Sequence, residues 1–223
     1  MTKEERQSAI LDQLLKQGSV LVSALSDNLQ VSAVTIRKDL TDLERQGRLY
    51  RSHGKAILIN PFTANRSVNE KEKLFPEEKY NIGTAAAQLV MPNDSIVIAS
   101  GTTVTAFAQC LQHSPRFTAV TSSIKVSEAL AANSEIEVIQ LGGRLRHSSL
   151  SVVGPDGEQT LAGCTFSKLF IGVDGIDLEY GITTTDLREA HLNKVMMGVA
   201  QKNIVLADSS KFGRRGFAKI CGM

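Results

Sequence analysis

The stretch VSAVTIRKDLTDLERQGRLYRSHGKA, residues 31–56, decides how the first part of this chain folds. Its first half predicts a helix over residues 32–46, because apolar side chains recur at a spacing of four and then three residues. These apolar positions are Ile36, Leu40 and Leu43. Ser32 stands where a helix needs a capping hydroxyl, and Gly47 is expected to end the helix.

The residues on either side of this helix complete a small domain. Residues 48–58 predict two short strands around a turn at His53–Gly54. Upstream, residues 4–17 carry an apolar stripe at helical spacing, formed by Ile10, Leu11, Leu14 and Leu15. After a short β-like stretch, a second helix is expected over residues 23–29, with Ser23 as its cap. Three short helices followed by a β-ribbon are the plan of a winged helix-turn-helix.

A winged helix-turn-helix over residues 1–58 would place the start of its third helix in the major groove of DNA. The side chains there that lie outside the apolar stripe are Ser32, Ala33, Val34, Thr35, Arg37 and Lys38. The wing candidates are Arg51, Ser52, His53 and Lys55. Arginine can bond two atoms of guanine, and residues 30–58 hold six Lys/Arg against three Asp/Glu, which suits a polyanion. On this pattern alone, a solvated charged face or a protein-contact surface remains the alternative.

Composition is typical of a globular protein of one or two domains. Of the 223 residues, 42% are apolar and 22% are charged. Cys110, Cys164 and Cys221 are far apart and form no Cys-x-x-Cys motif, so we expect reduced thiols. The first residues are charged, and no apolar run reaches the ~18 residues of a membrane helix. We therefore expect a cytoplasmic protein without a membrane segment, a metal or a cofactor.

A second domain is expected over residues 76–223, after a polar linker over residues 59–75. Within this domain, short apolar strands alternate with helical stretches, which predicts an α/β fold with a mostly parallel sheet. The expected strands are residues 95–99, 117–121, 136–141, 168–173 and 203–207. The chain stops soon after a strand-like stretch, as either a natural end or a truncated chain would.

Polar loops follow these strands, and the carboxyl ends of parallel strands meet in one crevice. In the first loop, Gly101 permits a tight turn, and Thr102 and Thr103 precede a helix whose free N–H groups suit a phosphate. Similar polar clusters follow the other strands, at residues 121–123, 142–146, 173–177, 181–186 and 207–213. Each cluster alone is an ordinary turn or cap, and none is a P-loop or a Gly-x-Gly-x-x-Gly motif. Their convergence is what favours a ligand site.

The stretch 31–56 resembles the amino-terminal signature of the DeoR family of bacterial regulators of sugar metabolism, roughly VS..TIRRDL..LE..G.L.R.HGGA. The similarity extends through most of the chain. One departure is Lys55, which stands where the family has the second glycine of the wing turn. The resemblance implies a DNA-binding transcription regulator, and we expect a repressor, although an activator would have the same sequence pattern.

The resemblance also implies an effector, a phosphorylated sugar or sugar alcohol, and residues that hold it. Carried over by position, the phosphate would lie on Gly101, Thr102 and Thr103. The rest of the pocket would be Ser122, Ser123, Gly142, Gly143, Asp174, Glu189 and Lys211. The same region resembles ribose-5-phosphate isomerase more distantly, with Asp174 and Asp177 kept and Glu189 matching the base. The lysine-plus-glycine segment of the isomerases is replaced by GITTTD (181–186), so we expect binding without turnover.

The leading hypothesis is a homo-oligomeric repressor, a dimer or a tetramer, that holds double-stranded operator DNA until its effector binds. Two copies would read two half-sites, which a single small domain does not do. One alternative is a sugar-phosphate isomerase with a DNA-binding appendage. Another is a protein-interaction module that uses neither DNA nor a small ligand.

Overall fold

The structure, a computed structural model, describes residues 1–46, 48–52, 54–58 and 67–223. The chain divides into an amino-terminal unit, Met1–Ala64, and a carboxyl-terminal unit, Asn65–Met223. Two expectations, Gly47 as a helix end and the turn at His53, fall outside the described residues. Within those residues, the helices are all too short or too polar to traverse a bilayer.

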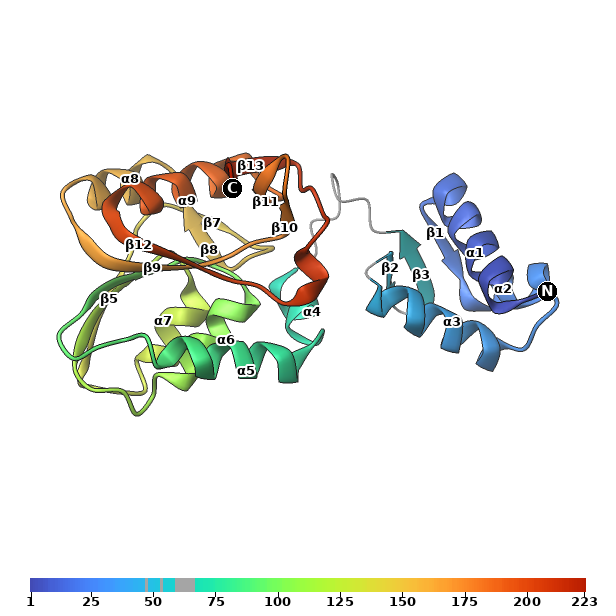
Figure 1. The fold of residues 1–223 in the computed structure, drawn as a ribbon, viewed down its shortest axis with the longest axis horizontal. Helices are drawn as coiled ribbons and strands as arrows, with labels where there is room; N and C mark the ends of the chain where they lie inside the picture. Colours follow the sequence, from blue (N-terminus) through green and yellow to red (C-terminus); the bar gives the residue numbers. More distant parts are fainter. Residues whose placement is uncertain (47, 53, 59–66) are drawn as a thin grey trace. The chain divides into compact units, whose positions relative to one another are not determined.

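The amino-terminal unit combines helices with a small antiparallel sheet (Figure 1). Its elements are α1 (Lys3–Gln17), β1 (Ser19–Leu21), α2 (Val22–Leu29), α3 (Ala33–Arg45), β2 (Leu49–Ser52) and β3 (Lys55–Leu58). The strand order is β1-β3-β2, so that β3 pairs with both of its neighbours. The winged helix-turn-helix expected from the sequence is confirmed.

The core of this unit contains the predicted apolar stripe of α3. Its members Ile36 and Leu40 are fully buried, and they pack with buried side chains of α1, α2 and the sheet. Two details were predicted wrongly. Leu15 is 68% exposed rather than part of the α1 stripe. Helix α2 begins at Val22, one residue before the expected cap Ser23, because the Val22 N–H already bonds the Gly54 carbonyl at 3.0 Å.

The carboxyl-terminal unit is built on a parallel sheet in the order β12-β9-β4-β5-β6, as the alternating pattern predicted. These strands are β4 (Ser95–Ile98), β5 (Phe117–Thr121), β6 (Ile136–Gln140), β9 (Phe166–Gly172) and β12 (Ala200–Leu206). The helices are α4 (Val68–Glu72), α5 (Pro76–Ala87), α6 (Thr102–Cys110), α7 (Ile124–Leu130), α8 (Pro155–Ala162) and α9 (Leu187–Val199), with a 3-10 turn at Ser209–Lys211.

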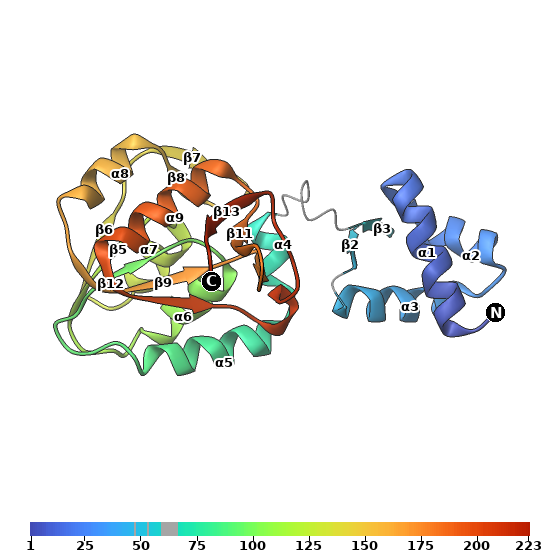
Figure 2. The same cartoon turned by 45° about the horizontal axis from the view of Figure 1, so that its top comes forward.

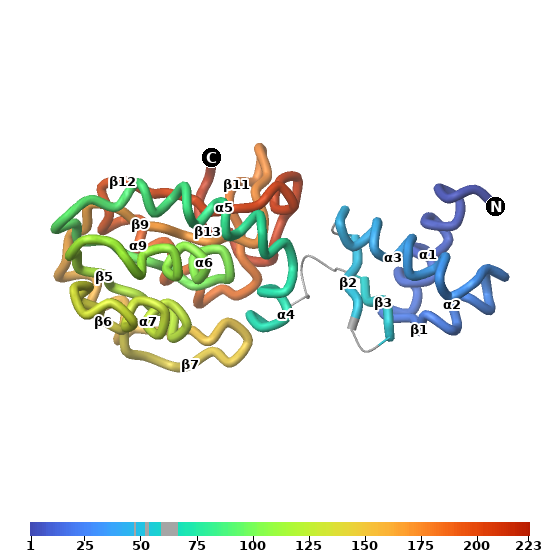
Figure 3. The backbone as a smooth tube through the Cα atoms, turned by 90° about the horizontal axis from the view of Figure 1, so that it is seen from below, coloured from blue at the N-terminus to red at the C-terminus, as the bar shows by residue number. Residues whose placement is uncertain are grey.

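Helices cover both faces of the sheet. Seen from below in Figure 3, α5, α6 and α7 lie side by side on one face. In Figure 2, α8 and α9 lie on the opposite side of the sheet from α5. Strand alternation separates the two apolar cores, because Ile96 and Ile98 join the core under α5–α7 while Val97 and Ala99 join the core under α9.

Several short elements beside the main sheet were not expected from the sequence. A hairpin forms from β7 (Arg144–Arg146) and β8 (Ser151–Val153). A second antiparallel sheet has the order β10-β11-β13, from β10 (Gly175–Asp177), β11 (Gly181–Thr184) and β13 (Ala218–Cys221). The segment expected as a linker over 59–75 contains α4, whose Val68 is only 4% exposed. This part of the linker prediction is therefore wrong, since α4 packs as part of the carboxyl-terminal unit.

Candidate functional site

Helix α3 presents a polar and basic face at its amino-terminal half. The Ser32 hydroxyl accepts the Thr35 N–H at 3.2 Å, so that Ser32 caps the helix as predicted. Val34 is 60% exposed, and the side chains of Ser32, Arg37 and Lys38 are also exposed. Ala33 and Thr35 are half-buried. Because the apolar stripe faces the core, these side chains are left on the surface.

Two ion pairs tie α3 to α1 and fix how it is presented. Arg6 bonds both carboxylate oxygens of Asp39, which is 2% exposed although it is charged. Nearer the surface, Lys3 pairs with Asp42 at 2.7 Å. An Arg–carboxylate contact through two nitrogens has a defined geometry, so the Arg6–Asp39 pair orients one helix on the other.

The wing places its two basic candidates differently. Lys55 is exposed and is the first residue of β3, where it pairs with Ser52 in an extended strand. This backbone accommodates a side chain at the position where the family signature has glycine. Arg51 instead donates to Glu44 of α3 from its Nε atom at 2.8 Å. Of the other two wing candidates, Ser52 is the last residue of β2, and His53 lies outside the described residues.

A pocket lies at the carboxyl ends of β4 and β9, and we call it the strand-end pocket. It encloses about 590 Å³ of space, including the part that opens to solvent. Its lining consists of Val68, Lys71, Ser100, Gly101, Thr102, Thr103, Arg146, Ser148, Ser149, Gly172, Val173, Asp174, Thr184, Glu189, Asn193 and Lys211. Six of the ten residues expected around an effector are among them: Gly101, Thr102, Thr103, Asp174, Glu189 and Lys211. The lining thus draws on five of the polar clusters expected from the sequence, at residues 101–103, 142–146, 173–177, 181–186 and 207–213.

The start of α6 forms one wall of the pocket. Gly101 precedes the helix with φ of 128°, a conformation that side chains of L-residues rarely adopt. Its lack of a side chain leaves the first turn of α6 without a side-chain cap. The N–H groups of this turn have no partner within the helix, and they carry the positive end of its dipole. This wall is therefore suited to an anion.

Cationic groups from distant parts of the chain complete the pocket. Lys71 of α4 pairs with Asp174 at 2.6 Å, and Lys211 also lines the pocket. Burial alone would raise the pKa of Asp174, but the charges of Lys71 and Lys211 hold that pKa well below its usual value. Burial lowers the pKa of Lys211, against the attraction of Asp174. Asp174 is therefore ionised, and it accepts hydrogen bonds.

Glu189 is engaged by donors on both of its carboxylate oxygens. Arg146 pairs with one oxygen at 3.0 Å, and the Ser151 hydroxyl donates to the same oxygen at 3.2 Å. The Thr184 hydroxyl lies 3.4 Å from the other oxygen and 3.1 Å from an oxygen of Asp174, so the two carboxylates share this one donor. Arg146 reaches Asp186 as well, at 3.2 Å, so that it joins the β7–β8 hairpin to α9. Arg146 and Ser151 thus occupy one oxygen of this carboxylate from within the chain, which is unfavourable for a general base that must reach a proton of the substrate.

The four other expected residues lie outside the pocket lining. Ser122 and Ser123 are at most 2% exposed, and the Ser123 hydroxyl caps α7 by accepting the Val126 N–H. Gly142 and Gly143 form the connection from β6 to β7. A Cβ atom on Gly143 would come within 2.8 Å of the Val153 carbonyl oxygen, so glycine is required there by the backbone.

Sequence reasoning missed several lining residues, above all Lys71, and it did not single out Arg146 within the expected cluster 142–146. Lys71 was hidden because its helix lies in a polar stretch that reads as a linker. The signal that could have found it is the capping box of Ser67 and Glu70, in which each side chain bonds the other's backbone N–H. Ser148 and Ser149 come from the loop of a hairpin too short to show a strand period.

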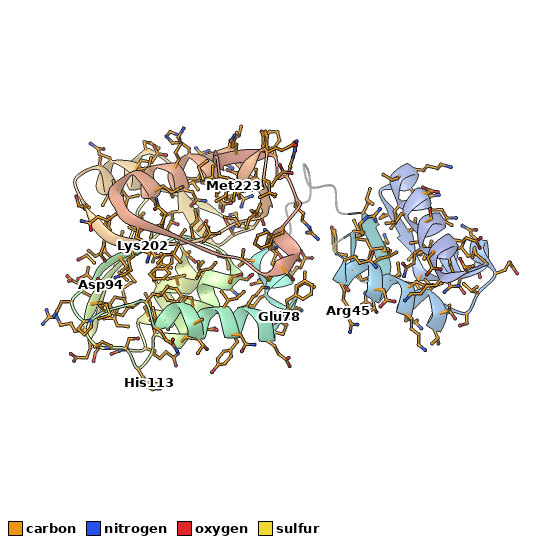
Figure 4. The ribbon with its side chains drawn as sticks, in the orientation of Figure 1. Arg45, Glu78, Asp94, His113, Lys202 and Met223 are labelled. Carbon is orange, nitrogen blue, oxygen red and sulfur yellow. The ribbon has the colours of Figure 1, made fainter. Side chains whose placement is uncertain are left out.

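A polar cluster of another kind lies at the amino-terminal ends of the strands. Asp94, labelled in Figure 4, precedes β4 at its amino-terminal end and pairs with Lys168 of β9. Burial opposes the ionisation of Asp94, but the Lys168 contact and other hydrogen bonds lower its pKa below the usual value. This cluster joins two strands at the end of the sheet opposite to the strand-end pocket.

The DeoR-like helix-turn-helix domain matches residues 6–62, and the DeoR C terminal sensor domain matches residues 75–223. A protein of Escherichia coli O157:H7, whose name proposes it as an aga operon transcriptional repressor, is 39% identical over 97% of this chain and 81% of its own length. The transcriptional repressor GlcR of Bacillus subtilis is 35% identical over 97% of this chain and 83% of its own length.

The lactose phosphotransferase system repressor of Streptococcus mutans is 34% identical over 97% of this chain and 87% of its own length. Among solved structures, ribose 5 phosphate isomerase A from Neisseria gonorrhoeae is similar with a TM-score of 0.44 and 22% identity. That similarity covers 62% of this chain and 54%, about half, of the isomerase chain. Together the two domain matches and the curated relatives cover nearly all of the sequence, and the chain belongs to the DeoR family of DNA-binding transcription regulators.

Proposed function

We propose that this protein represses a sugar-metabolism operon and is released from its operator when a phosphorylated sugar or sugar alcohol binds the strand-end pocket. The observation that carries the effector proposal is the meeting of the uncapped start of α6 with Lys71 and Lys211. A helix start and two cations bind a phosphate monoester, while carboxylates and hydroxyls nearby suit the hydroxyls of a sugar.

In the DNA complex, the start of α3 enters the major groove and Lys55 contacts the phosphate backbone. Arg37 is the proposed base-reading residue, because it is exposed near the start of the helix and can bond guanine through two nitrogens. Ser32, Ala33, Val34, Thr35 and Lys38 supply the surrounding contacts. We also propose that the protein acts in the cytoplasm as a homo-oligomer, a dimer or a tetramer, since paired half-sites need paired recognition helices.

Arg37 is tested by its replacement with alanine. We expect Arg37→Ala to weaken binding to an operator duplex, selected from a random library by the wild-type protein, by ~1–3 kcal/mol. The matched control is Lys16→Ala, which removes an exposed charge in the last turn of α1, a residue outside the proposed DNA contacts. Unchanged operator affinity in a fluorescence anisotropy titration of Arg37→Ala would contradict the base-reading role.

In the pocket, the phosphate lies on the N–H groups of Thr102 and Thr103, with Lys71 and Lys211 beside it. Asp174 accepts from a sugar hydroxyl, and Ser148 and Ser149 face the same space. The ligand shifts the equilibrium away from the DNA-binding state only if it binds that state more weakly. Lys71 supports such a difference in ligand affinity between the two states, because it belongs to α4, the first helix that follows the amino-terminal unit in the sequence.

We propose binding without turnover. An aldose–ketose isomerase needs a base beside the substrate, and the Glu189 carboxylate is instead held by Arg146, Ser151 and Thr184. Incubation with aldose and ketose phosphates should therefore leave both unchanged. Interconversion that is lost in Glu189→Gln would support an enzyme in place of a sensor.

The effector proposal is tested by release of the operator duplex across a panel of sugar phosphates and their unphosphorylated sugars. We expect release by at least one phosphate and by none of the sugars. Thr102→Asp should bind the duplex as the wild type does but resist release, because a carboxylate repels the phosphate yet is favourable at a helix start. Thr102→Ser, which keeps the hydroxyl, is the control. Release of Thr102→Asp at wild-type concentrations would contradict this phosphate position.

A further inference from the structure

Arg51 of the wing and Glu44 of α3 form a three-contact clamp. The Arg51 N–H donates to Glu44 Oε1 at 3.0 Å, and its Nε and Nη2 atoms both lie 2.8 Å from Glu44 Oε2. The side chain of Glu44 is 16% exposed and that of Arg51 is 38% exposed. Arg45, labelled in Figure 4, marks the end of α3 beside β2, where these contacts are made.

Strand alternation explains why Arg51 faces α3. Arg51 is two residues from Leu49 and directly opposite Ala56, and both of these are fully buried. Arg51 therefore shares the face of the hairpin that packs toward α3, while Lys55, beside Ala56 in the strand, lies on the other face. Two basic wing residues that look equivalent in the sequence thus have opposite orientations.

Helix geometry explains why Glu44 needs a partner. Arg37, Thr41 and Glu44 are spaced by four and three residues, so they lie along one face of α3. The face that begins with the proposed base-reading Arg37 therefore ends in a carboxylate. An unpaired carboxylate at that position would repel DNA phosphates, and the Arg51 guanidinium neutralises it. A pair at this exposure adds little to folding stability, so the contact is better explained by position than by stability.

We propose that Glu44 and Arg51 are positioning residues for operator recognition, and that Arg51 is not a phosphate contact. The clamp holds the wing at a fixed angle to α3, so that Lys55 and Arg37 meet DNA at a fixed separation. Arg51 belonged to the expected DNA contacts, and this assignment replaces that role. The inference rests on the proposed role of α3 in reading the operator.

Two substitutions separate the clamp from a direct phosphate contact. Glu44→Gln removes the charge that orients Arg51, and Arg51→Lys keeps a cation but loses the two-pronged contact. The clamp predicts that each lowers the ratio of operator affinity to random-duplex affinity by about tenfold, the size of one lost specific contact. Asp12→Asn, on α1, controls for the general loss of a negative charge.

A direct phosphate contact predicts the opposite results. Glu44→Gln would then free Arg51 and tighten operator binding, and Arg51→Lys would bind as the wild type does. Either of these outcomes, or no change in both variants, overturns the clamp, provided that thermal unfolding shows both variants to be folded. The double variant Glu44→Gln, Arg51→Gln provides a further test. If the clamp is right, the second substitution should not restore the operator specificity that Glu44→Gln loses. Arg37→Ala distinguishes failure of the clamp from failure of the proposed DNA-binding role of α3. Unchanged operator binding by Arg37→Ala would overturn the α3 interface itself.

Discussion

Lys79 shows how one buried charge makes stability depend on pH. The side chain is 5% exposed, and its ammonium group donates to the carbonyl oxygens of Lys71 and Leu74 near the end of α4. Burial, followed by repulsion from Lys211, lowers the pKa of Lys79 to about 8, from 10.5. Between these two values the unfolded chain binds more protons than the folded one, so stability rises with pH.

We therefore expect the free energy of unfolding of the carboxyl-terminal unit to rise from pH 8 to pH 9.5, by at most about 1.4 kcal/mol per pH unit from this group. Below pH 8 the Lys79 contribution should not change. Urea unfolding at each pH measures it. Lys211 is shifted in the same direction, so the comparison with Lys79→Met isolates Lys79. A pH dependence as steep in Lys79→Met as in the wild type would assign the effect to other groups.

The two ion pairs between α1 and α3 differ in burial and should differ in importance. Arg6→Ala leaves Asp39, at 2% exposure, as a buried carboxylate without its partner, which we expect to cost about 1–3 kcal/mol. Lys3→Ala breaks the Lys3–Asp42 pair, in which both side chains remain hydrated, and should cost less. Thermal unfolding of the two variants measures the difference. Equal losses would mean that Asp39 finds other partners when Arg6 is absent.

At the scale of elements, helices α5 and α6 approach each other so closely that only glycine fits between them. A Cβ atom on Gly83 would lie 2.9 Å from the backbone atoms of Ala106 and Phe107. Backbone cannot swing aside as a side chain can, so the helices would have to separate. This contact also supports the site, because α6 begins with the pocket residues Thr102 and Thr103.

Gly83→Ala is expected to destabilise the protein by about 1–3 kcal/mol, since overpacking outweighs the better helix propensity of alanine. Gly198→Ala is the matched control in another helix, α9, where an added Cβ meets nothing within 4 Å. That control should be neutral or gain up to about 1 kcal/mol. Urea unfolding tests both variants, and a Gly83→Ala protein as stable as the control would show that α5 and α6 can move apart freely.

The elements also show where local signals are sufficient and where they are not. The cap Ser32 and the stripe of Ile36 and Leu40 act over three to four residues, so the sequence predicts α3 almost to its ends. Helix α4 and the β7–β8 hairpin are too short for a hydrophobic period to show in the sequence. Their positions follow from contacts such as the Val68 N–H with the Ser148 carbonyl, at 2.6 Å.

For the whole molecule, two units with separate cores should respond separately to a small ligand. A sugar phosphate that binds the strand-end pocket at 100 times its Kd should stabilise the carboxyl-terminal unit by ~2.7 kcal/mol. Hydrogen exchange measured along the chain should slow in the core around Phe107 and Phe170, and less in the core around Leu40. Equal slowing in both cores would contradict separate response, and no slowing with any phosphate would contradict the pocket assignment.

The sequence by itself determined the winged helix-turn-helix, the strand–helix alternation and the loops at strand ends. These follow from hydrophobic period, caps and turn residues, which are properties of neighbours along the chain. Only the tertiary structure decided which polar groups meet. Lys71 and Asp174 are 103 positions apart, and the order of the strands together with the packing of α4 brings them together. The same reason separates Ser122 from the pocket and turns Arg51 toward Glu44, because the direction of a side chain depends on the partner surface as well as on its own strand.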